Sequence, residues 1–368
     1  MSQLPTFEKK PLGGINIREL AKILKEEGQK EADALLEKQL KTIKPMGIQL
    51  PKDHVVLLLG GSNGILRAVA IQLVFGEKVP VYAVHYDRES MQIGHYHVQA
   101  FKREAGKIGV DTQWWNADAT DPQVIQEVVN TLKQKYKVVH LINGIAAGAT
   151  KRYEQYGPTQ VRDIDVAFHP VLQYPDFSKL ENIRQFGLVD VAVATEKDIE
   201  RTNLFMGTST TLWVDPLAEA DLLQKGVSVV AFADYDFEKD DPVYGMGPLA
   251  GAKILQRESM DRAAQKYGVK AVRICYPAMD TTALGAIPGG LLMFALTTVI
   301  LNEKKAFKNL KQLAAETMEM FTPDFNSREL RLDKEFQAIL PEFHRRAEAL
   351  TPADVPGVFE PLTHLDLP

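Results

Sequence analysis

A tyrosine and a lysine, Tyr244 and Lys253, stand with eight residues between them in the segment YGMGPLAGAK. Gly247 and Pro248 predict the start of a helix between them, because proline is favoured in a first helical turn. Tyr244 would then precede the helix and Lys253 would lie inside it, so both could face one ligand. An ammonium near a phenol stabilises the phenolate and improves its acid-base chemistry, and the same lysine can hold a ribose. From composition alone, a surface lysine and a packed tyrosine are the more common interpretation.

Short apolar runs alternate with helical patterns and define the framework around this pair. Strands are predicted at residues 55–59, 79–84, 112–115, 138–143, 227–232 and 269–275. Helices are predicted at residues 65–75, 96–106, 122–135, 196–205 and 217–224, with another beginning at Pro248. This alternation is typical of an α/β fold with a doubly wound, Rossmann-like parallel sheet covered on both faces by helices.

Additional segments are expected around a Rossmann-like core at residues 53–302. Residues 1–52 are predicted to form a helical extension, with helices at 17–27 and 30–40, and residues 303–368 a helical or irregular one. Residues 149–195 contain three prolines and many polar side chains, which indicates an insertion after the fourth strand.

One apolar segment, residues 281–301, carries no charge and approaches the length of a membrane span. Pro288, Gly289 and Gly290 interrupt it. A buried helix beside an apolar ligand is therefore favoured over a transmembrane helix.

A glycine-rich loop lies between the first predicted strand and helix of the core. Small residues there let backbone N–H groups approach a pyrophosphate at the positive end of a helix. An ordinary strand-to-helix turn is the alternative. The placement favours a bound dinucleotide, and its predicted contacts in this loop are Gly60, Gly61, Ser62, Asn63, Gly64 and Ile65.

Tyr86 and Asp87, after the second predicted strand, indicate which dinucleotide binds. A carboxylate at that place accepts hydrogen bonds from the adenosine ribose and repels a 2′-phosphate, which favours NADH. Arg88 could instead attract a phosphate, and Asp87 could merely cap a turn. Further contacts are expected where the third and fourth strands end, from Asp118, Ala119, Ile145 and Ala146.

The composition argues against several classes of protein. The 48 acidic and 43 basic residues give a formal net charge of −5, so we expect no nucleic-acid partner. A single cysteine, Cys275, permits neither an intramolecular disulfide nor a thiolate metal cluster. We therefore expect a cytoplasmic protein without a metal.

Several of these blocks resemble, in the same order, the FabV-type enoyl-ACP reductase and trans-2-enoyl-CoA reductase family, a relative of the short-chain dehydrogenases. The resemblance spans about residues 50–300 and includes the glycine loop, the aromatic-acidic pair and the spacing of Tyr244 and Lys253. The other similar blocks are Gly94-His95-Tyr96-His97, Asp118-Ala119, Ala194-Thr195-Glu196, Leu212-Trp213-Val214-Asp215, and Thr281 with Ala286-Ile287-Pro288.

The resemblance implies NADH-dependent reduction of the C2=C3 double bond of a 2-enoyl thioester carried by CoA or acyl carrier protein. It makes Tyr244 the proton donor and Lys253 its partner, and it places Thr281 at the nicotinamide. The apolar helix beyond Pro288 would line the acyl channel.

Two positions depart from the family pattern. Leu66 stands where the family has the last glycine of its loop, which implies a wider separation of helix and strand. Asp234, ten residues before Tyr244, stands in the place of a second substrate-binding tyrosine. A carboxylate cannot donate to a thioester carbonyl unless it is protonated, so Asp234 is expected to alter the substrate site. The alternatives are a carbonyl or other alkene reductase on the same scaffold, and an NAD-binding protein impaired in catalysis.

Overall fold

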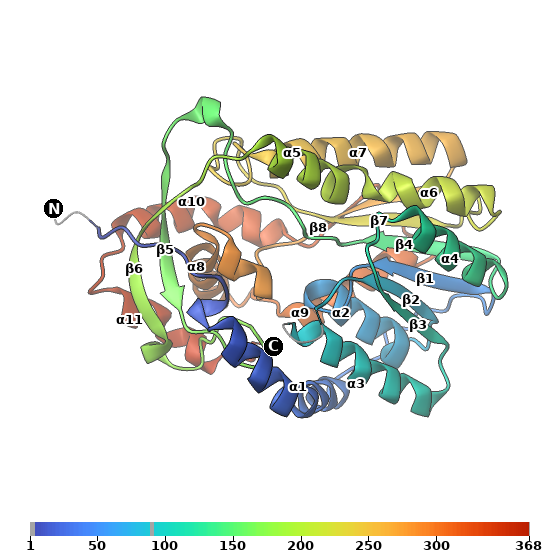
Figure 1. The fold of residues 1–368 in the computed structure, drawn as a ribbon, viewed down its shortest axis with the longest axis horizontal. Coiled ribbons are helices and arrows are strands. Elements are labelled where there is room, and N and C mark those ends of the chain that lie inside the picture. Colours follow the sequence, from blue (N-terminus) through green and yellow to red (C-terminus); the bar gives the residue numbers. More distant parts are fainter. Residues whose placement is uncertain (1–3, 89–91, 368) are drawn as a thin grey trace.

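The computed structural model describes residues 4–88 and 92–367, and its centre is a seven-stranded parallel sheet (Figure 1). In spatial order the strands are β3 (Thr112–Asn116), β2 (Val81–His85), β1 (His54–Leu59), β4 (Val138–Asn143), β7 (Val229–Asp234), β8 (Lys270–Cys275) and β9 (Glu329–Arg331). The chain adds β2 and β3 on one side of β1 and the later strands on the other. The loops after β1 and β4 therefore meet where the direction of sheet growth reverses, which is the usual ligand site of such sheets.

Helices cover both faces of the sheet, which confirms the predicted doubly wound α/β class. Alternate residues of β1 enter two separate apolar clusters, with Val56 and Leu58 in one and Val55, Leu57 and Leu59 in the other. The first cluster is completed by α2 (Gly64–Ile71), α3 (Ile93–Ile108) and α9 (Leu310–Thr317), with α1 (Ile17–Leu40) packed on α3. The second is completed by α4 (Pro122–Lys133), α6 (Ser209–Glu219) and α7 (Pro248–Tyr267).

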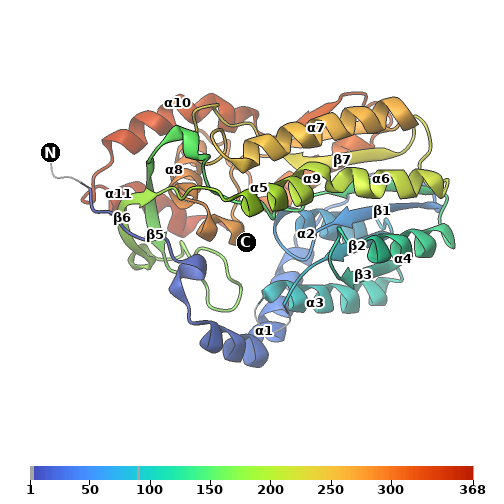
Figure 2. The same ribbon diagram turned by 45° about the horizontal axis from the view of Figure 1, so that its top comes forward.

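A second group of elements lies beside the carboxyl ends of the strands (Figures 1 and 2). It consists of the antiparallel strands β5 (Gln160–Val166) and β6 (Ile183–Asp190) and the helices α8 (Gly290–Glu303), α10 (Lys334–Ala349) and α11 (Val355–Phe359). Almost every residue of α8 from Gly290 to Leu301 is buried among these elements. Among the described residues, no helix is both long and apolar enough to cross a membrane.

The structure corrects several predicted elements. The two helices expected near the N-terminus are the single helix α1, which runs through Gly28, where the missing side chain leaves space for the ring of Tyr96. The helix predicted at 196–205 is α5 (Glu196–Thr202), which continues through the π-helical segment Asn203–Thr208 into α6. Because α6 ends at Glu219, the helix predicted at 217–224 is wrong over most of its length.

The core also extends beyond its predicted boundary at residue 302. Strand β9 comes from the C-terminal segment, pairs with β8 and completes the sheet. Strand β9 was not predicted, because a strand of three residues gives too little periodicity to be recognised without its partner. Within the predicted insertion at 149–195, β5 and β6 form a two-stranded sheet of their own.

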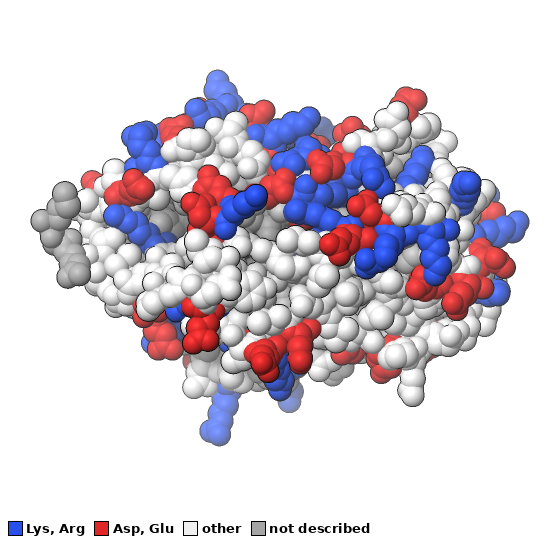
Figure 3. Space-filling model, turned by 90° about the horizontal axis from the view of Figure 1, so that it is seen from above, with Lys and Arg blue, Asp and Glu red and all other residues white. Residues whose placement is uncertain are grey.

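Charges of both signs are interspersed on the face of the molecule seen in Figure 3. Lys and Arg side chains gather near the middle of this view, with Asp and Glu beside them. This mixture agrees with the small net charge of −5.

A buried histidine pair should make the stability of the fold depend on pH. Nδ1 of His140 accepts the Val229 N–H at 3.1 Å, so its Nε2 carries the proton and donates to Nδ1 of His54 at 3.0 Å. Burial lowers the pKa of His140 from 6.5 to about 3. The pKa of His140 is lower in the folded state than in the unfolded state, so the unfolded chain binds this proton more readily. The free energy of unfolding is therefore largest above pH 6.5 and falls towards pH 3, by about 1.4 kcal/mol per pH unit.

Thermal unfolding measured between about pH 7 and pH 5 checks this expectation. The variant His140→Asn should show a weaker pH dependence than the wild type. His364→Gln changes an exposed histidine and should behave like the wild type. An unaltered pH dependence in His140→Asn would show that another group titrates.

Candidate active site

Three glycines shape the loop between β1 and α2. Their φ angles are positive, at 101° for Gly60, 103° for Gly61 and 59° for Gly64, a region that side chains rarely tolerate. The Asn63 side chain caps α2 by accepting the Gly64 N–H at 3.3 Å. Other N–H groups of the first turn lack helical partners and lie at the positive end of the helix, which suits a diphosphate.

A groove of about 850 Å³ runs from this loop along the carboxyl ends of β1 to β4. The predicted cofactor residues that line it are Gly60, Gly61, Ser62, Asn63, Tyr86, Asp87, Asp118, Ala119, Ile145 and Ala146. Arg201 and Phe205 also line the groove, with the guanidinium 5.6 Å from the ring centre. Sequence reasoning missed both residues because they reach the groove from α5 and the π-helical segment, far along the chain from these strand ends.

Asp87 lies at the edge of the groove, and other side chains fix its carboxylate. Oδ2 lies 2.7 Å from Nδ1 of His85, and Gly94 at the start of α3 leaves the space that the carboxylate occupies. The Asn116 side chain accepts the Asp87 N–H at 2.8 Å. These contacts hold a negative charge in the groove, next to Arg88, which also lines it.

We expect NADH to bind more tightly than NADPH, because the Asp87 carboxylate opposes a 2′-phosphate. Asp87→Asn should reduce the ratio of the two dissociation constants by about tenfold. Fluorescence titration with each nucleotide measures both constants, and Asp190→Asn, a change outside the groove, is the control. Equal or tighter NADPH binding by the wild type would show that Arg88 governs the pocket.

A second cavity, of about 330 Å³, adjoins the groove and shares with it the wall residues Gly61, Asn63, Ile145 and Ala146. The other predicted site residues that line this cavity are Gly64, Ile65, Asp234, Tyr244, Lys253 and Thr281. Many of its remaining walls are apolar, including Met293 of α8. A groove suited to a dinucleotide thus lies next to an apolar cavity that is lined by Tyr244 and Lys253.

Tyr244 lies just before α7, which begins at Pro248 as predicted. Asp241 accepts the Tyr244 N–H at 2.7 Å and thereby fixes the loop. The phenol ring stacks on Phe237 with ring centres 3.8 Å apart. Burial raises the pKa of Tyr244 above its usual value of 10, with a smaller contribution from Asp241. The phenol therefore keeps its proton at neutral pH and can act as an acid.

Lys253 points from α7 towards the end of β7, and its side chain is buried. Nζ donates to the Ala233 carbonyl at 2.7 Å and to Oε1 of Gln256 at 3.0 Å. Burial lowers the pKa of Lys253 to about 8. Its predicted partnership with Tyr244 stays a prediction, because no hydrogen bond joins the two side chains within the described part of the chain.

Asp234 lines the same cavity as Tyr244, and arginines pair with its carboxylate. Its carboxylate is fully buried, and Oδ2 is held by Arg257 at 2.9 Å and by Arg273. The next residue, Tyr235, also lines the cavity and meets the ring of Tyr244 edge-on, with ring centres 5.0 Å apart. Sequence reasoning missed Tyr235, because the resemblance drew attention only to the residue ten positions before Tyr244.

Leu66 is accommodated by a glycine on the opposite wall. The Leu66 side chain is buried and packs against Gly144, which follows β4. A Cβ atom on Gly144 would lie only 2.5 Å from the Leu66 side chain. The missing side chain of Gly144 thus provides the space that Leu66 fills.

A family model described as the trans-2-enoyl-CoA reductase catalytic region matches residues 89–321, more than half of the chain. The chain belongs to this family. That membership confirms the resemblance noted in the sequence. Two curated relatives are named as NADH enoyl-acyl-carrier-protein reductases. The one from Pseudoalteromonas atlantica is 27% identical over 265 residues, covering 68% of this chain and 65% of the relative. The one from Burkholderia vietnamiensis is 26% identical over 312 residues, covering 80% and 76%. The aligned part of the first relative is therefore less than two thirds of its length.

Solved structures of this family share the fold. The trans-2-enoyl-CoA reductase of Clostridium acetobutulicum in complex with NADH has a TM-score of 0.75 and 19% identity, covering 92% of each chain. That of Treponema denticola in complex with NAD has a TM-score of 0.70 and 17% identity, covering 96% of this chain and 88% of the other. At these identities the likeness establishes the arrangement of elements.

Proposed function

We propose that this family member uses NADH to reduce the C2=C3 double bond of a 2-enoyl thioester. The observation that carries the proposal is that the glycine-loop groove shares wall residues with the apolar cavity that contains Tyr244 and Lys253. The groove has the size and backbone donors for a dinucleotide, and the apolar walls suit an acyl chain. Membership of the trans-2-enoyl-CoA reductase family supports the same reaction class.

The predicted site residues fit a bound dinucleotide. The glycine loop would hold the diphosphate, and Asp87 would hold the adenosine ribose. Thr281, which lies against Gly64, would contact the nicotinamide end. NADH bound there would supply the hydride for C3 of the acyl chain. Tyr244 would supply the proton, and Lys253 would stabilise the phenolate and hold the nicotinamide ribose.

The alternative functions depend on Asp234, because a carboxylate cannot donate a hydrogen bond to a thioester carbonyl unless it is protonated. Arg257 and Arg273 pair with Oδ2 of Asp234 but give the carboxylate no proton to donate. A carbonyl or other alkene reductase is therefore the second candidate. The thioester carrier in this proposal is either CoA or acyl carrier protein, in cytoplasmic fatty acid metabolism.

An assay of NADH oxidation with a panel of acceptors tests the proposed function. The panel contains crotonyl-CoA, longer 2-enoyl-CoA esters, an enoyl thioester of acyl carrier protein, and simple aldehydes and ketones. We expect turnover with at least one enoyl thioester. Turnover confined to the carbonyl compounds would favour the carbonyl reductase instead, and tight NADH binding without turnover would favour the catalytically impaired protein.

A further inference from the structure

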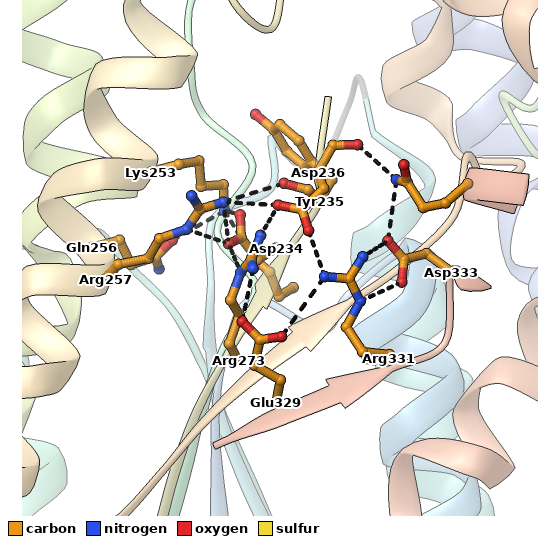
Figure 4. Close-up of polar contacts among 12 residues, drawn as sticks. Asp234, Tyr235, Asp236, Lys253, Gln256, Arg257, Arg273, Glu329, Arg331 and Asp333 are labelled. Atoms are coloured by element: carbon orange, nitrogen blue, oxygen red, sulfur yellow. Dashed lines mark hydrogen bonds and ion pairs between the residues drawn. The ribbon is translucent and has the colours of Figure 1, made fainter. Parts of the chain in front are cut away.

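The buried carboxylate of Asp234 lies at the centre of a charge cluster at the ends of β7, β8 and β9 (Figure 4). Asp234 ends β7, and Arg273 lies on the neighbouring strand β8. Lys253 and Arg257 approach from α7, four residues apart and therefore on one face of that helix. Three cationic groups thus surround a carboxylate that is 0% exposed.

The two carboxylate oxygens of Asp234 face different partners. Oδ2 accepts from Arg257 Nε at 3.0 Å and also from Arg273. Oδ1 accepts no hydrogen bond from a described residue and lies 3.7 Å from Nζ of Lys253. Oδ1 is therefore turned towards the one cation of the three that also lines the apolar cavity.

The rest of the cluster keeps Asp234 in this orientation. Asp236 binds Arg273 and lies 2.6 Å from Arg331 of β9, which in turn pairs with Asp333. Gln337 of α10 donates to the Asp236 carbonyl at 2.8 Å. These bonds attach the residues after β7 to β9 and α10, so neither Asp234 nor its arginines can turn away without breaking several of them.

We propose that Asp234 is a positioning residue that keeps the buried ammonium of Lys253 charged and directed to the end of β7. This inference rests on the proposed function, in which the Lys253 charge stabilises the Tyr244 phenolate. It assigns to Asp234 an action through Lys253 in place of a contact with substrate.

The groups around Lys253 support this role. Burial lowers the pKa of Lys253 to about 8, and Asp234 is the strongest influence that raises it. Arg257 and Arg273 each lower it, because like charges disfavour the ammonium. Tyr235 adds only a ring face, 5.1 Å from Nζ. Without the charge of Asp234, the two arginines and burial would act unopposed, and Lys253 would lose its proton at lower pH.

Asp234→Asn tests the proposal, with Asp236→Asn as the matched control because Asp236 contacts the same arginines but not Lys253. The Cε chemical shift of Lys253 in ¹³C-lysine-labelled protein, assigned with Lys253→Arg, reports the titration without cofactor or substrate. We expect the midpoint to fall by about one to three pH units in Asp234→Asn. It should move much less in Asp236→Asn.

Arg257→Gln is a second variant, for which the expected shift of the Lys253 midpoint has the opposite sign. The Arg257 side chain is 40% exposed, so its loss is less disruptive to the fold. Its Lys253 midpoint should rise. An unchanged midpoint in Asp234→Asn, or equal shifts in the two aspartate variants, would overturn the proposal. If Asp234→Asn does not fold, the proposal would be overturned by a Lys253 midpoint that fails to rise in Arg257→Gln.

Activity then separates this proposal from the proposed function. With any acceptor that the wild type reduces, the alkaline limb of the kcat/KM profile should move to lower pH in Asp234→Asn, in parallel with the Lys253 midpoint. A shifted midpoint in a protein that reduces no enoyl thioester would refute the proposed function and leave the Asp234–Lys253 pairing supported. A shifted midpoint with an unmoved alkaline limb would overturn the role of Asp234 in turnover.

Discussion

Replacing Tyr244 by phenylalanine should lower kcat by about 10²- to 10⁴-fold while leaving the fold and the NADH dissociation constant nearly unchanged. The substitution removes one hydroxyl, so the ring can still stack on Phe237. Neither the glycine loop nor Asp87 is touched, and the loss should therefore lie in proton transfer. Steady-state kinetics and a fluorescence titration with NADH measure the two effects separately.

Tyr156→Phe is the matched control, because it removes the hydroxyl of a half-exposed tyrosine outside both cavities. Its kcat should equal that of the wild type. Near-normal turnover by Tyr244→Phe, on an acceptor that the wild type reduces, would rule out this phenol as the proton donor.

Lys253→Met should impair kcat and cofactor affinity together. Methionine keeps much of the side-chain volume but removes the ammonium that stabilises the phenolate and holds the ribose. We expect kcat to fall by about 10²-fold. Loss of hydrogen bonds from a charged donor should weaken NADH binding by about 10- to 100-fold.

Lys266→Met, on an exposed part of the same helix, is the control for the loss of one positive charge. It should change neither quantity. If Lys253→Met reduced kcat but bound NADH as tightly as the wild type, the contact of Lys253 with the ribose would be wrong.

The class of fold could be predicted because its signals are local. The continuous apolar run of β1, the glycines after it and the helical spacing of α2 follow one another within about twenty residues. The loop-to-helix placement of Tyr244 and Lys253 was likewise readable from Gly247 and Pro248. Each of these signals depends on neighbours in the chain.

The environment of Asp234 could not be predicted, because its partner Arg273 stands 39 residues further along and reaches it only through strand pairing. The same limit applies to β9, whose three residues are recognisable as a strand only beside β8. Family resemblance singled out Asp234, ten residues before Tyr244, and gave no reason to expect Tyr235, which also lines the cavity.

The most direct test of the proposed reaction is transfer of deuterium from NADH deuterated at C4 of the nicotinamide to a 2-enoyl thioester such as crotonyl-CoA. The purified protein should oxidise the nucleotide and yield the saturated thioester with deuterium at C3, and the proton at C2 should come from solvent. Mass spectrometry and NMR of the product locate both atoms. Deuterium on a carbonyl carbon, or no saturated product from any 2-enoyl thioester while NADH still binds, would contradict the proposed function.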